Sequence, residues 1–188
     1  MSIALIVLIV LLVLLVLYAV VTFNRIVRLR NQSEEAFSDI DVQLKRRHDL
    51  IPNLVETVKG YAAHERQVFE NVTAARSNAT AAHGPEAQAQ AENQLTGALR
   101  QLFAVAENYP DLKANQNFQQ LQNQLSDIEN KIAAARRFFN NAVQEYNTGI
   151  QQFPAVLLAG PLGFTQKDFF DVGVEQRKEL EQAPQVKF

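Results

Sequence analysis

The sequence predicts an all-α protein, with an N-terminal transmembrane helix followed by an antiparallel bundle of long helices in coiled-coil-like packing. Residues 3–21 form an unbroken apolar run, and beyond residue 24 apolar residues recur at alternating spacings of three and four. The seven Gly and six Pro cluster, so long stretches carry no helix breaker. We expect an anchor over residues 1–24, a helical bundle over residues 25–153 and an apolar, then polar, tail over residues 154–188.

The composition excludes several classes of function. The chain of 188 residues has no Cys, which rules out a disulfide framework, a thiol nucleophile and Cys-ligated metal sites. Its formal net charge of -2 argues against a nucleic-acid-binding protein, which would concentrate Lys and Arg. The length is that of one domain.

The apolar run of residues 3–21 has the length of a membrane-spanning helix. Its 19 residues contain no charge and would reach about 28 Å, close to the hydrocarbon thickness of a bilayer. A cleaved signal peptide fits less well, because no basic segment precedes the run, the run is too long and no small-x-small cleavage site follows it. We therefore expect a retained, single-pass anchor.

The charges beside the run predict its orientation. No Lys or Arg precedes it, whereas Arg25, Arg28 and Arg30 follow at once, and basic flanks tend to stay cytoplasmic. This predicts an N-terminus outside and a cytoplasmic domain. The alternative is an anchor of the opposite orientation that carries a periplasmic domain, and the arginines also suit anionic lipid headgroups.

Three prolines divide the rest of the chain, because the residue before a proline is disfavoured in a helix. The breaks are expected at Gly84-Pro85, Tyr109-Pro110 and Phe153-Pro154. In the first segment ten of twelve positions at three-four spacing are apolar, which predicts one helix of about 50 residues. The twelve positions are Phe37, Ile40, Leu44, Arg47, Ile51, Leu54, Val58, Tyr61, Glu65, Val68, Val72 and Ala75. Because this seam stays in phase across Pro52, a kink there is favoured over a new helix capped by Asp49.

The later segments show the same periodicity. A middle helix from Glu86 to about Asn108 is expected to turn one face to its neighbours, with Ala87, Ala91, Leu95, Ala98, Leu102 and Val105. The third segment predicts one helix of roughly 40 residues, with a seam of Phe118, Leu121, Leu125, Ile128, Ile132, Ala135, Phe139, Ala142 and Tyr146. The apolar stretch 154–163 is too short to span a bilayer and is expected to pack on a neighbour.

Candidate metal ligands are few. His48 and Asp49 lie 16 residues before His64 and Glu65, which is about 24 Å along a continuous helix, and this spacing fits no metal motif. The sequence contains no arrangement of Ser, His and acidic residues that predicts a catalytic nucleophile with its base. The acidic pairs Glu34-Glu35 and Glu179-Glu181 are typical of solvated charges, although acid–base work by paired carboxylates stays open. We predict no catalytic, cofactor-binding or metal-binding residue and no cofactor.

A basic cluster, Lys45-Arg46-Arg47, places an arginine in the apolar seam, and Arg136-Arg137 form a second basic pair. A charge at a seam position is typical of pairing that sets helix register. The candidate partners are Glu56, Glu65, Glu107 and Glu129. Binding of phosphate or lipid headgroups is the alternative use of such arginines.

Residues 45–61, with the sequence KRRHDLIPNLVETVKGY, resemble the signature of the LemA family. A second block at residues 106–115, AENYPDLKAN, also resembles it, and the likeness extends over nearly the whole chain. Other matching positions are Phe118, Leu121, Ile128-Glu129-Asn130, Ala135-Arg136-Arg137, Asn140, Tyr146-Asn147 and Phe153-Pro154. His48 and Phe138-Phe139 depart from the family's usual residues. The resemblance implies a bacterial membrane-anchored helical bundle with its domain in the cytoplasm, and it supplies no catalytic residues.

We therefore expect a non-enzymatic scaffold that self-associates at the bacterial inner membrane, with the bilayer and other membrane proteins as further partners and no nucleic acid. Helices of about 75 Å and about 35 Å cannot cover one another, so part of each seam would be left for a second copy. A monomer whose seam is covered by the apolar tail from Ala155 to Phe164 is the alternative. The rival function is an adaptor or subunit of a membrane-associated enzyme such as a protease.

Overall fold

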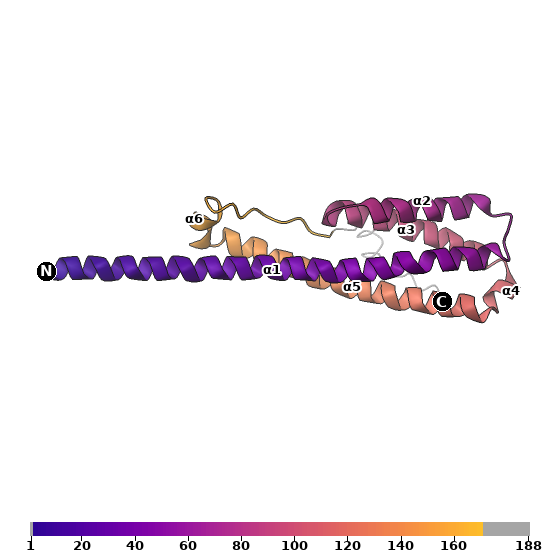
Figure 1. Ribbon diagram of the computed structural model, residues 1–188, viewed down its shortest axis with the longest axis horizontal. Helices are drawn as coiled ribbons and strands as arrows, with labels where there is room; N and C mark the ends of the chain where they lie inside the picture. The colour runs from indigo at the N-terminus through magenta and orange to yellow at the C-terminus, as the bar shows by residue number, and fades with distance from the viewer. Residues whose placement is uncertain (1, 171–188) are drawn as a thin grey trace, which may run out of the picture.

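The protein, in a computed structural model, is described over residues 2–170, and within that range every regular element is helical. This confirms the all-α class. Figure 1 shows one helix running the whole length of the molecule, with the others gathered along the part of it that follows a bare N-terminal stretch. The elements are α1 (Ile3–Lys59), α2 (Arg66–Ala81), α3 (Pro85–Ala106), α4 (Pro110–Lys113), α5 (Gln116–Gln151) and α6 (Ala155–Ala159).

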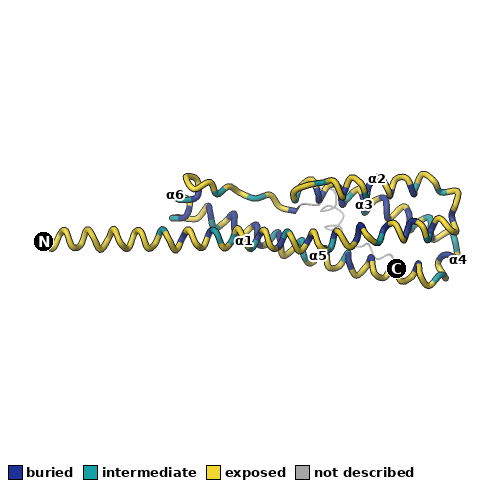
Figure 2. Tube along the Cα trace, viewed as in Figure 1, coloured by how far each residue is buried: buried dark blue, intermediate teal, exposed yellow. Residues whose placement is uncertain are grey.

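Helix α1 contains both the apolar run and a long stretch of the bundle. Its first five turns project alone and are exposed (Figure 2). The apolar run in these turns is the one candidate membrane span in the described residues. From Thr22 onward the helix has a buried face that includes Ile26, Ile40 and Leu44. The same helix thus continues from the apolar run into the bundle without a break.

Helix α5 runs antiparallel to α1 and pairs with it along most of the bundle (Figure 1). Its predicted seam is confirmed, since seven of its nine positions are buried and Leu121 and Ala135 are half-buried. The rings of Phe37 and Phe139 lie 5.4 Å apart. Near the span a Cβ on Gly149 would lie 2.7 Å from Leu29 Cδ1, so the glycine lets the two helices approach closely there.

The prediction of one first helix of about 50 residues is wrong. The chain ends α1 at Lys59, turns over residues 60–65 and returns as α2. The reversal lets α2 bury Phe69, Val72 and Ala79 against the rest of the bundle, whereas a straight helix would carry them into solvent. Pro52 lies inside α1, which runs through it, so no new helix begins at Asp49.

Helices α2 and α3 form a hairpin beside the far half of the α1–α5 pair (Figure 1). The predicted break at Gly84-Pro85 is confirmed: Gly84 adopts φ 85°, a region that favours glycine, and Pro85 begins α3. On α3, Ala91, Leu95, Ala98 and Leu102 are buried as predicted, Val105 is half-buried and Ala87 is exposed.

The half of the α1–α5 pair that lies next to the apolar run, here called the near half, is covered by the chain that follows α6. Tyr146 Oη donates to the carbonyl of Thr165 at 2.9 Å, and Asn147 exchanges two 2.9 Å hydrogen bonds with the backbone of Lys167. The predicted packing of the apolar stretch is confirmed at α6, where Ala155 and Ala159 are buried with Ile26.

Two of these features remove the uncovered seam that was expected. The first segment folds back as a hairpin partner, and the chain after α6 covers the half that the hairpin does not reach. The expectation that part of each seam lies uncovered is therefore wrong for the described residues, while self-association itself stays a prediction. The division at residues 24 and 153 also stays a prediction, and residues 171–188, with Glu179 and Glu181, lie outside the described residues.

Candidate functional site

The middle of the bundle holds a charge cluster, formed by Arg47, His48, Glu92 and Glu129, in which the side chains of Arg47 and Glu92 are fully buried and that of Glu129 is 44% exposed. Arg47 on α1 is fully buried and donates from Nη1 to Glu92 Oε2 of α3 at 2.8 Å. Its Nη2 lies 2.7 Å from Glu129 Oε1 of α5 and donates to Thr96 Oγ1 at 2.8 Å. One guanidinium thereby joins three helices.

His48 extends the cluster to the fourth long helix. Its Nε2 lies 2.6 Å from Glu92 Oε1, and its backbone carbonyl accepts a 2.7 Å hydrogen bond from Arg76 Nε of α2. Both oxygens of Glu92, which is fully buried, are therefore engaged by neighbouring residues of α1. All four long helices meet at this level of the bundle.

The cluster balances its charges at a cost. Arg136 lies nearby, and burial lowers its pKa, as does the positive charge of Arg47, whereas Glu92 and Glu129 oppose this shift. Two guanidiniums and two carboxylates are thus close enough to affect one another, with Arg47 and Glu92 fully buried and Glu129 partly exposed. The Nε atoms of Arg47 and Arg136 are buried without a hydrogen-bond partner in the structure. Buried donors without a partner destabilise the folded state.

A groove of about 410 Å³ opens beside the cluster, between α1 and the α2–α3 hairpin. Its walls carry charges of both signs, so no single ligand charge is favoured. They include Asp41, Lys45, His48, Asp49, Arg76, Thr80 and His83.

A hydroxyl, an imidazole and a carboxylate lie next to one another here, in Thr80, His48 and Glu92, which is the order of groups in a catalytic triad. Nucleophilic activation requires the hydroxyl to give its proton to the imidazole. The Thr80 hydroxyl instead donates to the Arg76 carbonyl at 2.9 Å and lies 3.5 Å from His48 Nδ1. This geometry fits structural pairing better than nucleophilic catalysis.

The structure separates the candidate metal ligands. His48 is buried at the cluster, Asp49 is exposed in the groove wall, and His64 and Glu65 lie in the turn before α2. Within residues 2–170 no three His, Asp or Glu side chains form a group that would hold a metal ion. The two pairs are not brought together.

The pairing predicted for Arg47 is confirmed with Glu129, one of its four named candidates. Of the others, Glu56 pairs with Lys59, Glu107 pairs with Lys113, and Glu65 precedes α2. Glu92 was missed. Its one signal is a position next to the alanine-rich face of α3, at a three-residue spacing from Leu95.

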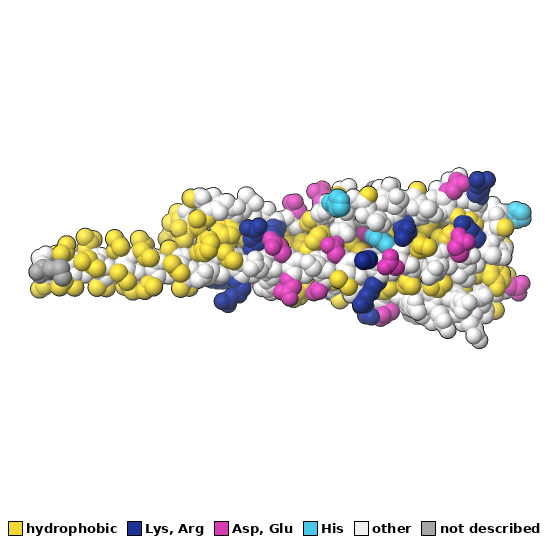
Figure 3. Space-filling model, in the orientation of Figure 1, with side chains coloured by type: hydrophobic (Ala, Val, Ile, Leu, Met, Phe, Trp, Pro, Cys, Tyr) yellow, Lys and Arg dark blue, Asp and Glu magenta, His cyan; other side chains and the backbone are white. Residues whose placement is uncertain are grey.

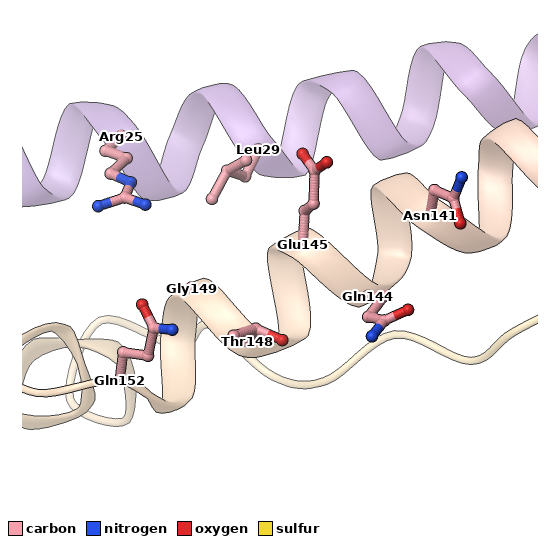
Figure 4. Close-up of a pocket in the computed structure, with 8 residues that line it drawn as sticks. All are labelled: Arg25, Leu29, Asn141, Gln144, Glu145, Thr148, Gly149 and Gln152. Atoms are coloured by element: carbon pink, nitrogen blue, oxygen red, sulfur yellow. The ribbon is translucent and has the colours of Figure 1, made fainter.

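A second groove, of about 440 Å³, lies between α1 and α5 near the end of the apolar run. Figure 4 shows Arg25 reaching from α1 toward the end of α5, and Glu145 rising from α5 toward α1. Its other lining residues are Leu29, Asn141, Gln144, Thr148, Gly149 and Gln152. The groove combines polar and apolar surface and lies directly beyond the apolar run.

Comparison with known proteins identifies the family. The LemA family profile matches residues 36–188, most of the chain. The chain belongs to the LemA family. The match spans the bundle and the charge cluster, and together with the apolar N-terminal helix it makes this LemA-family chain a membrane-associated helical protein.

Relatives agree with this assignment. The chain is 25% identical to the magnetosome protein MamQ of Magnetospirillum gryphiswaldense over 177 residues, which cover 80% of this chain and 65% of MamQ. A MamQ protein of Paramagnetospirillum magneticum is similar to the same extent. The protein LemA of Metamycoplasma hominis is 28% identical over 163 residues, which cover 84% of this chain and 70% of that protein. The chain thus spans just under two thirds of the length of the MamQ relatives, at 65%.

Proposed function

We propose that this LemA-family chain is a non-enzymatic, membrane-anchored scaffold of the bacterial inner membrane. The observation that carries the proposal is the continuity of α1, whose 57 residues include both the exposed apolar run and one wall of the bundle. A helix shared by anchor and bundle holds the bundle at a set angle to the anchor. Such a rod presents its sides to other proteins at a fixed height above the membrane.

The proposed topology is a single-pass anchor with the N-terminus outside and the bundle in the cytoplasm. Arg25, Arg28 and Arg30 support it, because they are exposed immediately beyond the apolar run and basic flanks tend to stay cytoplasmic. In Figure 3, Lys and Arg side chains gather where the apolar shaft meets the bundle.

The proposed partners are the bilayer, further copies of the chain and other membrane proteins. Anchoring confines copies to two dimensions and so raises their effective concentration. Two large apolar side chains on the outside of the bundle, Val42 of α1 and Phe138 of α5, are 49% and 50% exposed and would be covered by association. The near-neutral net charge of -2 gives no support to a nucleic-acid partner.

The absence of enzymatic activity is proposed from the state of the charge cluster. Its groups bind one another, and the Thr80 hydroxyl, which lies 3.5 Å from His48 Nδ1, donates its hydrogen bond to the backbone carbonyl of Arg76. In the rival function the chain is an adaptor or subunit of a membrane protease. In that case the bound enzyme would supply the chemistry, so a proteolytic partner would co-purify with the native chain.

An assay of the purified full chain separates these functions. A scaffold leaves a panel of esters, phosphates and peptides unchanged above the buffer background. Turnover that disappears in His48→Asn and in Thr80→Val, but persists in the exposed control His64→Asn, would contradict the proposal. A protease that co-purifies with the native chain, and loses activity when the chain is removed, would favour the adaptor.

A further inference from the structure

An uncharged apolar segment lies beside the end of the anchor. The chain has no Asp, Glu, Lys or Arg between Glu145 and Lys167. Residues 152–163, here termed the α6 loop, contain four large apolar side chains that are between 46% and 80% exposed: Phe153, Val156, Leu157 and Leu162. Soluble surfaces carry such side chains singly, and a contiguous group marks an interaction surface.

The α6 loop is held against the last turns of the apolar run. Phe153 and Pro154 line a small cavity together with Tyr18 and Thr22 of α1. The ring of Phe164 contacts that of Phe23 edge-on, with centroids 5.8 Å apart. Figure 1 shows α6 at the end of the bundle from which the bare part of α1 emerges. The loop is thus fixed at one height along the anchor.

That height corresponds to the membrane interface. The apolar run matches the hydrocarbon thickness and ends at Val21, and Arg25 follows within about 6 Å along the helix. Tyr18 and Thr22 therefore lie on either side of the boundary between acyl chains and headgroups. Aromatic side chains favour this region, and uncharged apolar segments bind there without spanning the bilayer.

The same placement identifies what covers the loop. Its exposed side chains adjoin the exposed surface of the anchor, and Figure 3 shows hydrophobic side chains on both the shaft and the adjoining end of the bundle. A surface that adjoins the lipid-facing anchor and carries no charge is matched by lipid. Ala155 and Ala159 meanwhile hold α6 onto Ile26 and Ile150, so the exposed side chains are presented by a packed element.

We propose that the α6 loop enters the membrane interface beside the anchor, with Phe153, Leu157 and Leu162 among the outer segments of the acyl chains. This inference rests on the proposed anchoring. Two contacts with one leaflet prevent rotation of the bundle about the axis of α1. The bundle would then always turn the same side to its neighbours in the membrane.

Tryptophan fluorescence tests the proposal, because the chain has no Trp and each introduced Trp is a unique reporter. Leu157→Trp and Phe153→Trp report on the loop, at side chains 64% and 80% exposed, where a larger ring is tolerated. Leu11→Trp reports on the anchor. Gln124→Trp, at an exposed position near the opposite end of α5, is the matched control. Each full-length variant is reconstituted into phosphatidylcholine–phosphatidylglycerol vesicles whose acyl chains are unbrominated, brominated near the headgroup, or brominated near the methyl end, because Leu11 lies near the middle of the apolar run.

We expect bromine near the headgroup to quench the loop reporters and bromine near the methyl end to quench the anchor reporter, all with blue-shifted emission, and both to leave Gln124→Trp unchanged. If Leu11→Trp is quenched while both loop reporters match Gln124→Trp, the loop inference is wrong and the anchor stands. Blue-shifted loop reporters that bromine does not quench would show that protein, such as a second copy, covers the loop, and would also overturn it. An unquenched Leu11→Trp would overturn the anchoring and this inference together.

Discussion

Arg47 occupies a core position where an apolar side chain would be expected, and two carboxylates from two other helices neutralise it. Removing such charges from water costs several kcal/mol, so a buried pair adds little net stability. It does penalise any packing in which the partners fail to meet. We infer that the charge cluster sets the register of α1, α3 and α5.

Glu92→Gln tests this role. The change keeps the shape of the side chain but leaves the Arg47 guanidinium without its fully buried carboxylate. We expect a loss of about 3–5 kcal/mol in the free energy of unfolding, measured by denaturant titration of the full chain in detergent. The control Glu70→Gln, which removes an exposed pair with Arg66, is expected to cost less than about 1 kcal/mol. Equal effects of the two changes would contradict the register role.

Glu34 gives the chain after α6 a dependence on pH. Hydrogen bonds from Lys167 and then Arg30 lower the pKa of Glu34 below its ordinary value of 4.5. The carboxylate therefore stabilises the folded state above pH 4.5, and this contribution is lost as the pH falls through the lowered pKa. We expect the hydrogen-exchange protection factor of the Lys167 amide to fall over that window.

The matched variants are Glu34→Gln and Glu35→Gln. Glu34→Gln is expected to have low protection at Lys167 at every pH, because the ion pair with Lys167 is absent. Glu35 lies next in the sequence and is exposed, so its variant is expected to behave like the wild type. Protection that is independent of pH in the wild type would contradict this account.

At the scale of the helices, the sequence predicted α5 closely because its three-four spacing has no exception. It did not predict the turn at residues 60–65, because Val58, Tyr61 and Val68 stay in phase across the turn and no proline marks it. The available signals were Gly60 and a charged residue, Glu65, at a seam position. Periodicity reports which face of a segment is buried, but not whether the segment reverses direction.

The charge cluster was predictable only in part, for a related reason. Arg47 was visible as a charge in a seam, and Glu129 as a carboxylate within reach. Glu92 was hidden because a single face was expected to be buried on α3. That helix packs against α2 and also reaches the charge cluster, so Gln88, Glu92 and Leu99 are buried beside the predicted face.

The α1–α5 packing makes a direct prediction at Ile128, which is buried in the core cluster that also contains Ile40 and Leu44. Ile128→Ala should lower the free energy of unfolding by about 2–5 kcal/mol, since it removes buried methyl and methylene groups. Gln124→Ala, one turn earlier on the exposed side, should change it by less than about 0.5 kcal/mol. Thermal melts followed by circular dichroism would compare them. If Ile128→Asp also melted like the wild type, the phase of α5 would be wrong.

On the scale of the whole molecule, α1 is about 85 Å long, and roughly a third of that length is the apolar run. The remaining length forms one wall of the bundle and, in the proposed anchoring, rises from the membrane. The hairpin covers the distal half and the chain after α6 covers the proximal half. The result is an elongated, rod-shaped bundle, and most of its surface is the outer faces of its helices rather than the wall of a cavity.

The topology predicts where the end of the chain lies. Because the arginines beyond the run favour the cytoplasmic side, a reporter fused after Phe188 is expected in the cytoplasm. Paired fusions of green fluorescent protein and alkaline phosphatase at that position measure this. Fluorescence without phosphatase activity is expected, and the reverse result would place the bundle in the periplasm.

The scaffold proposal is tested most directly by the mass of the full chain in detergent, measured by light scattering with the detergent contribution subtracted. Self-association predicts that the protein mass at micromolar concentration is at least twice the chain mass of 21.1 kDa. Val42→Glu with Phe138→Glu, at the two exposed apolar positions on the outside of the bundle, should shift that mass toward the monomer. A wild-type protein of 21.1 kDa as a single species would contradict the account.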